Sequence, residues 1–192
     1  DLLPFFHLDN HTPDSFYLEA LRNAQCDRIA LVGCQDLKIV PAERIDPLVN
    51  AIHDQFGNIP VAAGSDAFFT EFNRNRISAE KADAFVFSIN PQVHAFDNLS
   101  ITETLEGQEA VVKTALAISG GKPVWVSPVS LKMRWNPNAT GEEAVPQGEL
   151  FVENIIRRDD FDFADIRAEL IGTIFQAIDP EDEEADWQWI EP

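Results

Sequence analysis

The sequence has little cysteine and little positive charge. Cys26 and Cys34 are its two cysteines, and two isolated cysteines make neither a disulfide framework nor a CxxC metal knuckle. Its 14 basic residues stand against 33 acidic ones, for a formal charge of -19, and they form no basic stripe. A field of that sign repels phosphate backbones. We therefore expect a reduced, cytoplasmic setting and no nucleic-acid partner.

Long apolar runs and the usual nucleophile motifs are also missing. No stretch approaches the roughly 20 apolar residues that a membrane span requires, so we expect no membrane partner. The sequence begins at Asp1 without an initiator Met, a basic leader or a cleavage site, which suggests a fragment or an excised domain. Ser65 and Ser127 lack a G-x-S-x-G elbow, and neither cysteine has a suitable motif. A covalent serine or cysteine hydrolase is therefore poorly supported.

Five short runs rich in β-branched and aromatic residues indicate buried strands. They cover residues 2–8, 28–33, 59–64, 84–90 and 123–128, and their nearly continuous apolar character is typical of parallel strands covered on both faces. Helical patterns lie between them. One follows Thr12-Pro13, one follows Pro41, and one follows the capping box Ser100-Ile101-Thr102-Glu103 and ends at Gly120-Gly121. This alternation indicates repeated βαβ units.

The predicted fold class is α/β: a partial (β/α) TIM-type barrel of parallel strands with an acidic helical C-terminal extension. A complete barrel needs about 250 residues, and the chain has 192. We assign residues 1–148 to the βα units, and 149–192 to a C-terminal helix over 161–177 followed by an acidic tail. The terminal strands of such a piece would be covered by missing barrel units or by flanking domains of a longer protein.

Polar residues follow the predicted strands, where ligands gather in parallel α/β folds. Asp66 follows the third strand, and Asn90, Gln92 and His94 follow the fourth. Pro91 keeps Asn90 out of helical geometry, so these side chains can be held at fixed angles over the strand ends. Amides both donate and accept hydrogen bonds, which suits a polyhydroxylated small molecule. The alternative is that the amides only satisfy loop backbone.

Glu71 is the carboxylate that the sequence singles out as a general acid or base. Three neighbouring phenylalanines, at 68, 69 and 72, can partly desolvate it, whereas Arg74 or Arg76 can keep it ionised as an orienting group. The alternative is an ordinary Glu–Arg pair in a surface loop.

The triplet His7-x-Asp9-x-His11 has the ligand types of a metal site, which His94 could complete. Against that, His7 and His11 alternate along an extended segment, and His11 lies at a predicted helix cap, where His, Asp and Asn are ordinary. We therefore expect no metal and no cofactor.

Four segments carry a family resemblance: "AGSDAFFTEFNRNR" (63–76), "FSINPQVHAFDN" (87–98), "ETLEGQ" (103–108) and "GGKPVWVSPVSLKMRWNPNATG" (120–141). Together they resemble the barrel domain of D-apionate lactonases, also called D-apionolactonases, bacterial enzymes of apiose catabolism that hydrolyse the lactone of a branched-chain sugar acid. The resemblance covers roughly residues 60–141, and the sequence after Gly141 departs from the family pattern. It implies a (β/α) barrel with flanking domains and a sugar-lactone substrate.

Lactone opening needs an activated water, stabilisation of the tetrahedral oxyanion and a proton for the departing ring oxygen. Within the resembling segments we assign Glu71 as general base or acid and His94 as its proton partner. The predicted groups for the substrate's hydroxyls and carbonyl are Asn73, Arg74, Asn90, Gln92 and Asp66.

Two alternatives stay open. A glycosidase would need a second carboxylate about 5–10 Å from the first, and Asp9, Asp36, Asp66 and Asp97 qualify by position. A noncatalytic fragment that binds sugar weakly or aggregates would fit the edges of an incomplete barrel and the acidic tail.

Overall fold

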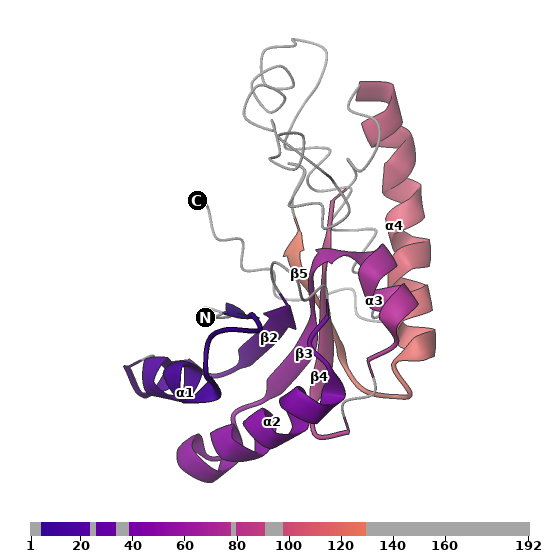
Figure 1. Ribbon diagram of the computed structural model, residues 1–192. Helices are drawn as coiled ribbons and strands as arrows, with labels where there is room; N and C mark the ends of the chain where they lie inside the picture. The colour runs from indigo at the N-terminus through magenta and orange to yellow at the C-terminus, as the bar shows by residue number, and fades with distance from the viewer. Residues whose placement is uncertain (1–4, 24–25, 34–38, 78–79, 91–97, 130–192) are drawn as a thin grey trace.

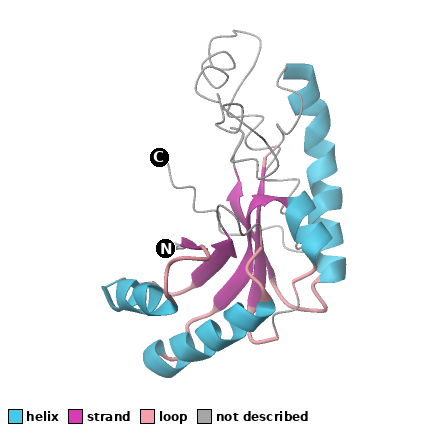
Figure 2. Ribbon diagram, in the orientation of Figure 1, coloured by secondary structure: helices cyan, strands magenta, loops and turns pink. Residues whose placement is uncertain are grey.

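The computed structural model describes residues 5–23, 26–33, 39–77, 80–90 and 98–129 (Figure 1). The predicted C-terminal helix, the acidic tail and the domain division at residue 148 lie outside these residues, as do Cys34, Asp36, Gln92, His94 and Asp97. Strands and helices alternate along the described chain (Figure 2). In order they are β1 (Phe5–Leu8), α1 (Asp14–Asn23), β2 (Ile29–Gly33), α2 (Ala42–Phe56), β3 (Val61–Phe68), α3 (Phe69–Asn75), β4 (Ala84–Ile89), α4 (Asn98–Ile118) and β5 (Val124–Val129).

The three helices predicted from apolar spacing are confirmed as α1, α2 and α4. In α2 the four predicted core positions, Ile45, Leu48, Val49 and Ile52, are all buried. The starts differ slightly from the prediction. α1 and α2 each begin one residue after the proline that was expected at the first helical position, and α4 begins at Asn98, two residues before the expected N-cap Ser100.

The segment between the third and fourth strands differs most from the prediction. β3 runs four residues beyond its predicted end, to Phe68, and α3 follows at once. The alternative that placed Glu71 in a surface loop does not hold, because these residues form a short helix. The helix ends at Asn75 and is capped by Arg76, whose φ of 41° lies in the left-handed region.

The five strands form one parallel sheet with the order β1-β2-β3-β4-β5. Right-handed connections between successive neighbours place every helix on the same face. The packing agrees: buried residues of α1 and α2 share one hydrophobic cluster with Leu31 and Ala63, and those of α3 and α4 share another with Phe85 and Val124. Because these four strand residues are register partners, they share one face. Figure 1 shows the four helices in succession, from α1 to α4.

The opposite face of the sheet carries mostly small and aliphatic residues. Ala30, Ala62 and Ala84 are register partners and fully buried or nearly so. The next row contains Val32, Gly64, Val86 and Trp125. A consecutive strand order with all helices outside is the arrangement of a (β/α) barrel, whereas a doubly wound sheet has helices on both faces. The described chain is consistent with part of a TIM-type barrel, as predicted.

Candidate active site

The carboxyl ends of the parallel strands form one edge of the sheet, and several predicted site residues lie there. Asp66 lies near the end of β3, Glu71 lies in α3 directly after it, and Asn90 follows β4. Glu71 and Asn90 are buried, and Asp66 is partly buried. Enzymes of the barrel class place their catalytic residues at this edge.

A bulge near the end of β3 displaces Asp66 from the regular ladder. Ser65 pairs with Phe87 and Phe68 pairs with Ser88, so Asp66 and Ala67 lie between two pairs that are adjacent on β4. Ser65 Oγ accepts a hydrogen bond from the Ala67 backbone N–H at 3.1 Å, and the Ser88 hydroxyl donates to the Ala67 carbonyl. Bulges of this kind re-aim a side chain next to active sites.

Asp66 meets His7 of β1 across the width of β2. His7 Nε2 lies 2.7 Å from Asp66 Oδ2, and the imidazole N–H is the donor because a carboxylate only accepts. The His7 side chain is 44% exposed and that of Asp66 only 13%. The sequence singles out both residues but gives no signal for the pair: Asp66 is predicted to bind substrate, and His7 is weighed as a metal ligand. Their 59-residue separation hides the contact.

Glu71 is 3% exposed although it lies in a short helix at the sheet edge. Asn75 donates to its backbone carbonyl at 2.7 Å and lies 3.4 Å from Oε2. Arg74 Nη1 is 4.0 Å from Oε1, and the Arg74 side chain is 68% exposed, so this ion pair is weak. Asn73 is partly buried. The side chain of Glu71 is thus shielded from solvent, and its role in proton transfer stays a prediction.

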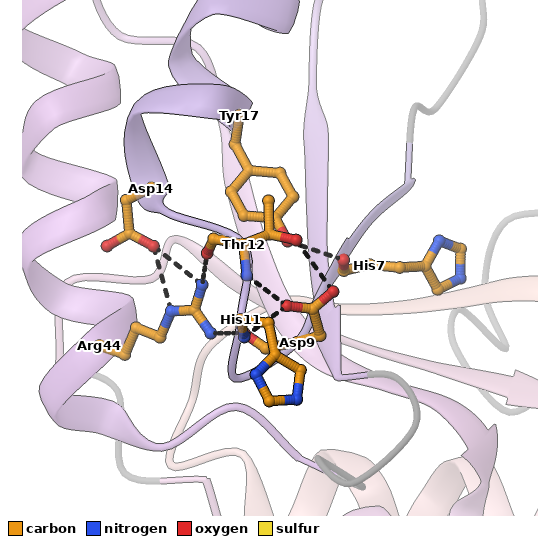
Figure 3. Close-up of polar contacts among 7 residues, drawn as sticks. All are labelled: His7, Asp9, His11, Thr12, Asp14, Tyr17 and Arg44. Atoms are coloured by element: carbon orange, nitrogen blue, oxygen red, sulfur yellow. Dashed lines mark hydrogen bonds and ion pairs between the residues drawn. The ribbon is translucent and has the colours of Figure 1, made fainter.

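The loop after β1 is held by the carboxylate of Asp9 (Figure 3). Asp9 Oδ1 accepts from the backbone N–H groups of Thr12 at 2.6 Å and His11 at 2.7 Å, and Oδ2 accepts from the Thr12 hydroxyl at 2.9 Å. These donors, those of Thr12 first, hold the pKa of Asp9 below its usual range. Asp9 therefore works as a local turn cap.

The candidate metal triplet is not assembled in this geometry. Figure 3 shows the rings of His7 and His11 pointing in different directions, with the carboxylate of Asp9 turned to the loop backbone. Within the described residues there is no group of three or more His, Cys, Asp or Glu that could hold a metal ion. The partner of His7 is Asp66 instead.

Asp9 makes stability depend on pH. A carboxylate whose pKa is lower in the folded state stabilises the fold above its unfolded pKa of about 4, and this contribution is lost as the pH falls through the folded value. We expect Asp9→Asn to be less stable than the parent at pH 7 and the difference to shrink at pH 3. Urea denaturation at the two pH values measures it. A difference independent of pH would contradict this account.

Arg44 of α2 ties the same loop to the body of the protein. Its guanidinium donates to the carbonyls of Asp9 and Thr12 and pairs with Asp14 at 3.0 Å (Figure 3).

Arg44→Ala should lower the free energy of unfolding by about 2 kcal/mol, because the bonds are charge-assisted and the side chain is mostly buried. Arg28 is the control, since its exposed side chain pairs only with the neighbouring Asp27 among the described contacts, and Arg28→Ala should cost less than about 0.5 kcal/mol. Thermal or urea unfolding measures both variants. If Arg44→Ala and Arg28→Ala lost the same free energy of unfolding, Arg44 would not stabilise the loop in this way.

None of the described helices has the length and apolar character that crossing a bilayer requires.

Comparison with known proteins identifies related sequences. A family model described as "D-apionate lactonase, TIM barrel domain" matches residues 19–164. The D-apionate lactonase of Brucella anthropi is 31% identical over 105 residues, which are 55% of this chain and 17% of that protein. The chain thus spans less than a fifth of the length of this relative. The range matched by the family model contains Asp66, Glu71 and Asn90, whereas His7 precedes it.

Proposed function

The chain belongs to the family of D-apionate lactonase TIM barrel domains, and on this basis we propose that it forms part of the barrel of an enzyme that hydrolyses D-apionolactone to D-apionate. The observation that carries the proposal is the family match over 19–164, which includes Glu71, His94 and the substrate-binding residues assigned from the sequence. The setting we propose is bacterial carbohydrate catabolism. The cytoplasmic location remains a prediction from the sequence.

The reaction adds water across the ester bond of the lactone ring. A base takes a proton from water as its oxygen bonds to the carbonyl carbon, and an acid gives a proton to the ring oxygen as its bond to that carbon breaks. Hydrogen-bond donors must also stabilise the negative charge on the carbonyl oxygen between these steps. The products are a carboxyl group and a free hydroxyl on the same molecule.

Glu71 is the proposed acid or base. Its support is its position three residues beyond the end of β3 and its burial, which removes the carboxylate from bulk water. His94, its proposed proton partner, lies outside the described residues, so this role rests on the sequence.

Amide and guanidinium groups near Glu71 are proposed to bind the substrate. Asn90 follows β4 and is buried at the sheet edge, and Asn73 and Arg74 lie on α3 beside Glu71. Amides serve both donor and acceptor hydroxyls of a sugar acid, and a guanidinium suits a carbonyl oxygen with developing charge. Gln92, assigned to the same task, lies outside the described residues, and Asp66 is the remaining proposed substrate contact.

The test is an assay of the full-length protein that contains this chain. A pH-stat follows acid release from D-apionolactone and from a few aldonolactones, and each rate is corrected for spontaneous hydrolysis. A separate assay with an aryl glycoside tests the glycosidase alternative. We expect turnover of D-apionolactone well above the spontaneous rate and none of the glycoside. Cleavage of the glycoside alone would favour the glycosidase alternative and overturn the lactonase proposal.

A further inference from the structure

We propose that His7 and Asp66 form a proton-transfer dyad in which His7 is the general base for the hydrolytic water and Asp66 positions its ring. This rests on the lactone hydrolysis proposed above. It gives Asp66 a positioning role in place of a substrate contact and leaves Glu71 the role of general acid.

The geometry of the pair fits this division of labour. The 2.7 Å contact between His7 Nε2 and Asp66 Oδ2 fixes the proton on Nε2, so Nδ1 carries the lone pair in the neutral ring. Asp66 is the less exposed partner, at 13% against 44% for His7. A shielded carboxylate can orient and stabilise an imidazolium, while the more exposed ring reaches water and substrate.

Two further contacts hold His7, one to its backbone and one to its ring. The Tyr17 hydroxyl donates to the His7 carbonyl at 3.0 Å, which ties the strand end to α1 (Figure 3). Phe5 stacks on the imidazole with ring centroids 6.3 Å apart and an angle of 29°. The imidazole itself points away from the Asp9 and Arg44 contacts in Figure 3. Its orientation is thus set before a substrate arrives, as general base catalysis requires.

Asp66 is presented by the bulge of β3. The bulge places its side chain outside the regular pairing with β4, and the hydroxyl of Ser88 lies 3.4 Å from its backbone carbonyl while donating to that of Ala67. A regular β3 strand would make its backbone hydrogen bonds to β4 without a bulge. The bulge therefore serves to aim the carboxylate along the sheet edge toward β1.

The proposed step balances as follows. His7 Nδ1 takes a proton from water as the water oxygen bonds to the lactone carbonyl carbon, and the imidazolium is stabilised by the Asp66 carboxylate. The tetrahedral intermediate then expels the ring oxygen, which receives a proton from the carboxylic acid form of Glu71. The imidazolium finally returns its proton, through solvent, to the Glu71 carboxylate. One lactone and one water yield one hydroxy acid, and both side chains are restored.

A second His–Asp pair provides a matched control at the other end of the strands. His53 Nε2 lies 3.3 Å from Asp83 Oδ2 and 3.1 Å from the Ile59 carbonyl, and Asp83 also accepts from the Val61 backbone N–H at 2.8 Å. These contacts lie at the start of β3 and β4. Polar contacts at this amino-terminal edge of a barrel serve stability, whereas the carboxyl edge carries catalysis.

Chemical rescue in the full-length protein tests the dyad. His7→Gly should lower kcat for D-apionolactone by about 10² to 10⁴ with little change in KM, and added imidazole should restore at least about tenfold of the loss. Asp66→Asn should lower kcat by at least about tenfold, because an amide does not stabilise the imidazolium, and imidazole should not rescue it. His7→Gln keeps a donor toward Asp66 but cannot take the proton, so it decides the outcome if His7→Gly does not fold.

The controls separate the dyad from a structural role and from the proposed function. His53→Gly should keep kcat within about twofold and ignore imidazole. Wild-type turnover combined with a folded His7→Gln variant that keeps kcat within about threefold would overturn the dyad alone, as would a folded, inactive His7→Gly variant without rescue. Absence of lactone turnover by the wild-type protein would overturn the proposed function, and the dyad's role with it.

Discussion

Glu71→Gln in the full-length protein should lower kcat for D-apionolactone hydrolysis by about 10² to 10⁴, the usual contribution of a general acid or base. The amide keeps the shape of the side chain but cannot exchange the proton that lactone opening requires. Of the contacts described above, an amide oxygen can still accept from Asn75, and the 4.0 Å pair with the exposed Arg74 is weak. Initial rates of lactone hydrolysis give kcat for the variant and the parent. Thermal unfolding of both proteins shows whether the variant is folded.

Glu109→Gln is the matched control. Glu109 is also a helical glutamate with a cationic partner, Lys113, but its side chain is 43% exposed on α4. The same chemical change there should leave kcat within about twofold of the parent, as for an ordinary surface substitution. If Glu71→Gln retained the parent kcat as well, the assignment of Glu71 to proton transfer would be wrong.

The sequence predicts most of the sheet because its signals are local. Each buried strand is a continuous apolar run, and each long helix carries its own spacing, as the four buried positions of α2 show. α3 was missed because it has seven residues, too few for a helical period to stand out, and because its phenylalanines continue the apolar character of β3.

The candidate site was predicted less completely because its contacts are distant in sequence. Neither a bulge nor a pair between strands that are not neighbours has a local pattern, and both are needed to bring Asp66 to His7. The metal-ligand role that the sequence analysis weighed for Asp9, and did not favour, is absent for a related reason. A carboxylate between two histidines has the composition of a metal site, but the nearest donors are the backbone N–H groups two and three residues on, and these bind it first.

Gly64→Ala should be the most damaging small substitution in the sheet. An added Cβ would lie 1.6 Å from the backbone carbonyl oxygen of Val86 and 2.8 Å from Val86 Cγ1. No rotamer change relieves a clash with backbone, so β3 and β4 would have to separate where they pair. We expect a loss of at least about 3 kcal/mol, at the upper end for overpacking, and a melting temperature lower by about 10 °C.

Gly107→Ala provides the opposite expectation from the same chemical change. Gly107 is exposed on α4, and a Cβ there would meet nothing within 4 Å. Because glycine costs about 0.5–1 kcal/mol relative to alanine within a helix, this variant should be more stable than the parent by that amount. Thermal unfolding of the two full-length variants against the parent gives both signs in one experiment. If the Gly64→Ala protein had the same melting temperature as the parent, β3 and β4 would have to leave room for a Cβ that is placed 1.6 Å from the Val86 carbonyl oxygen. Glycine would then not be required in this row of the sheet.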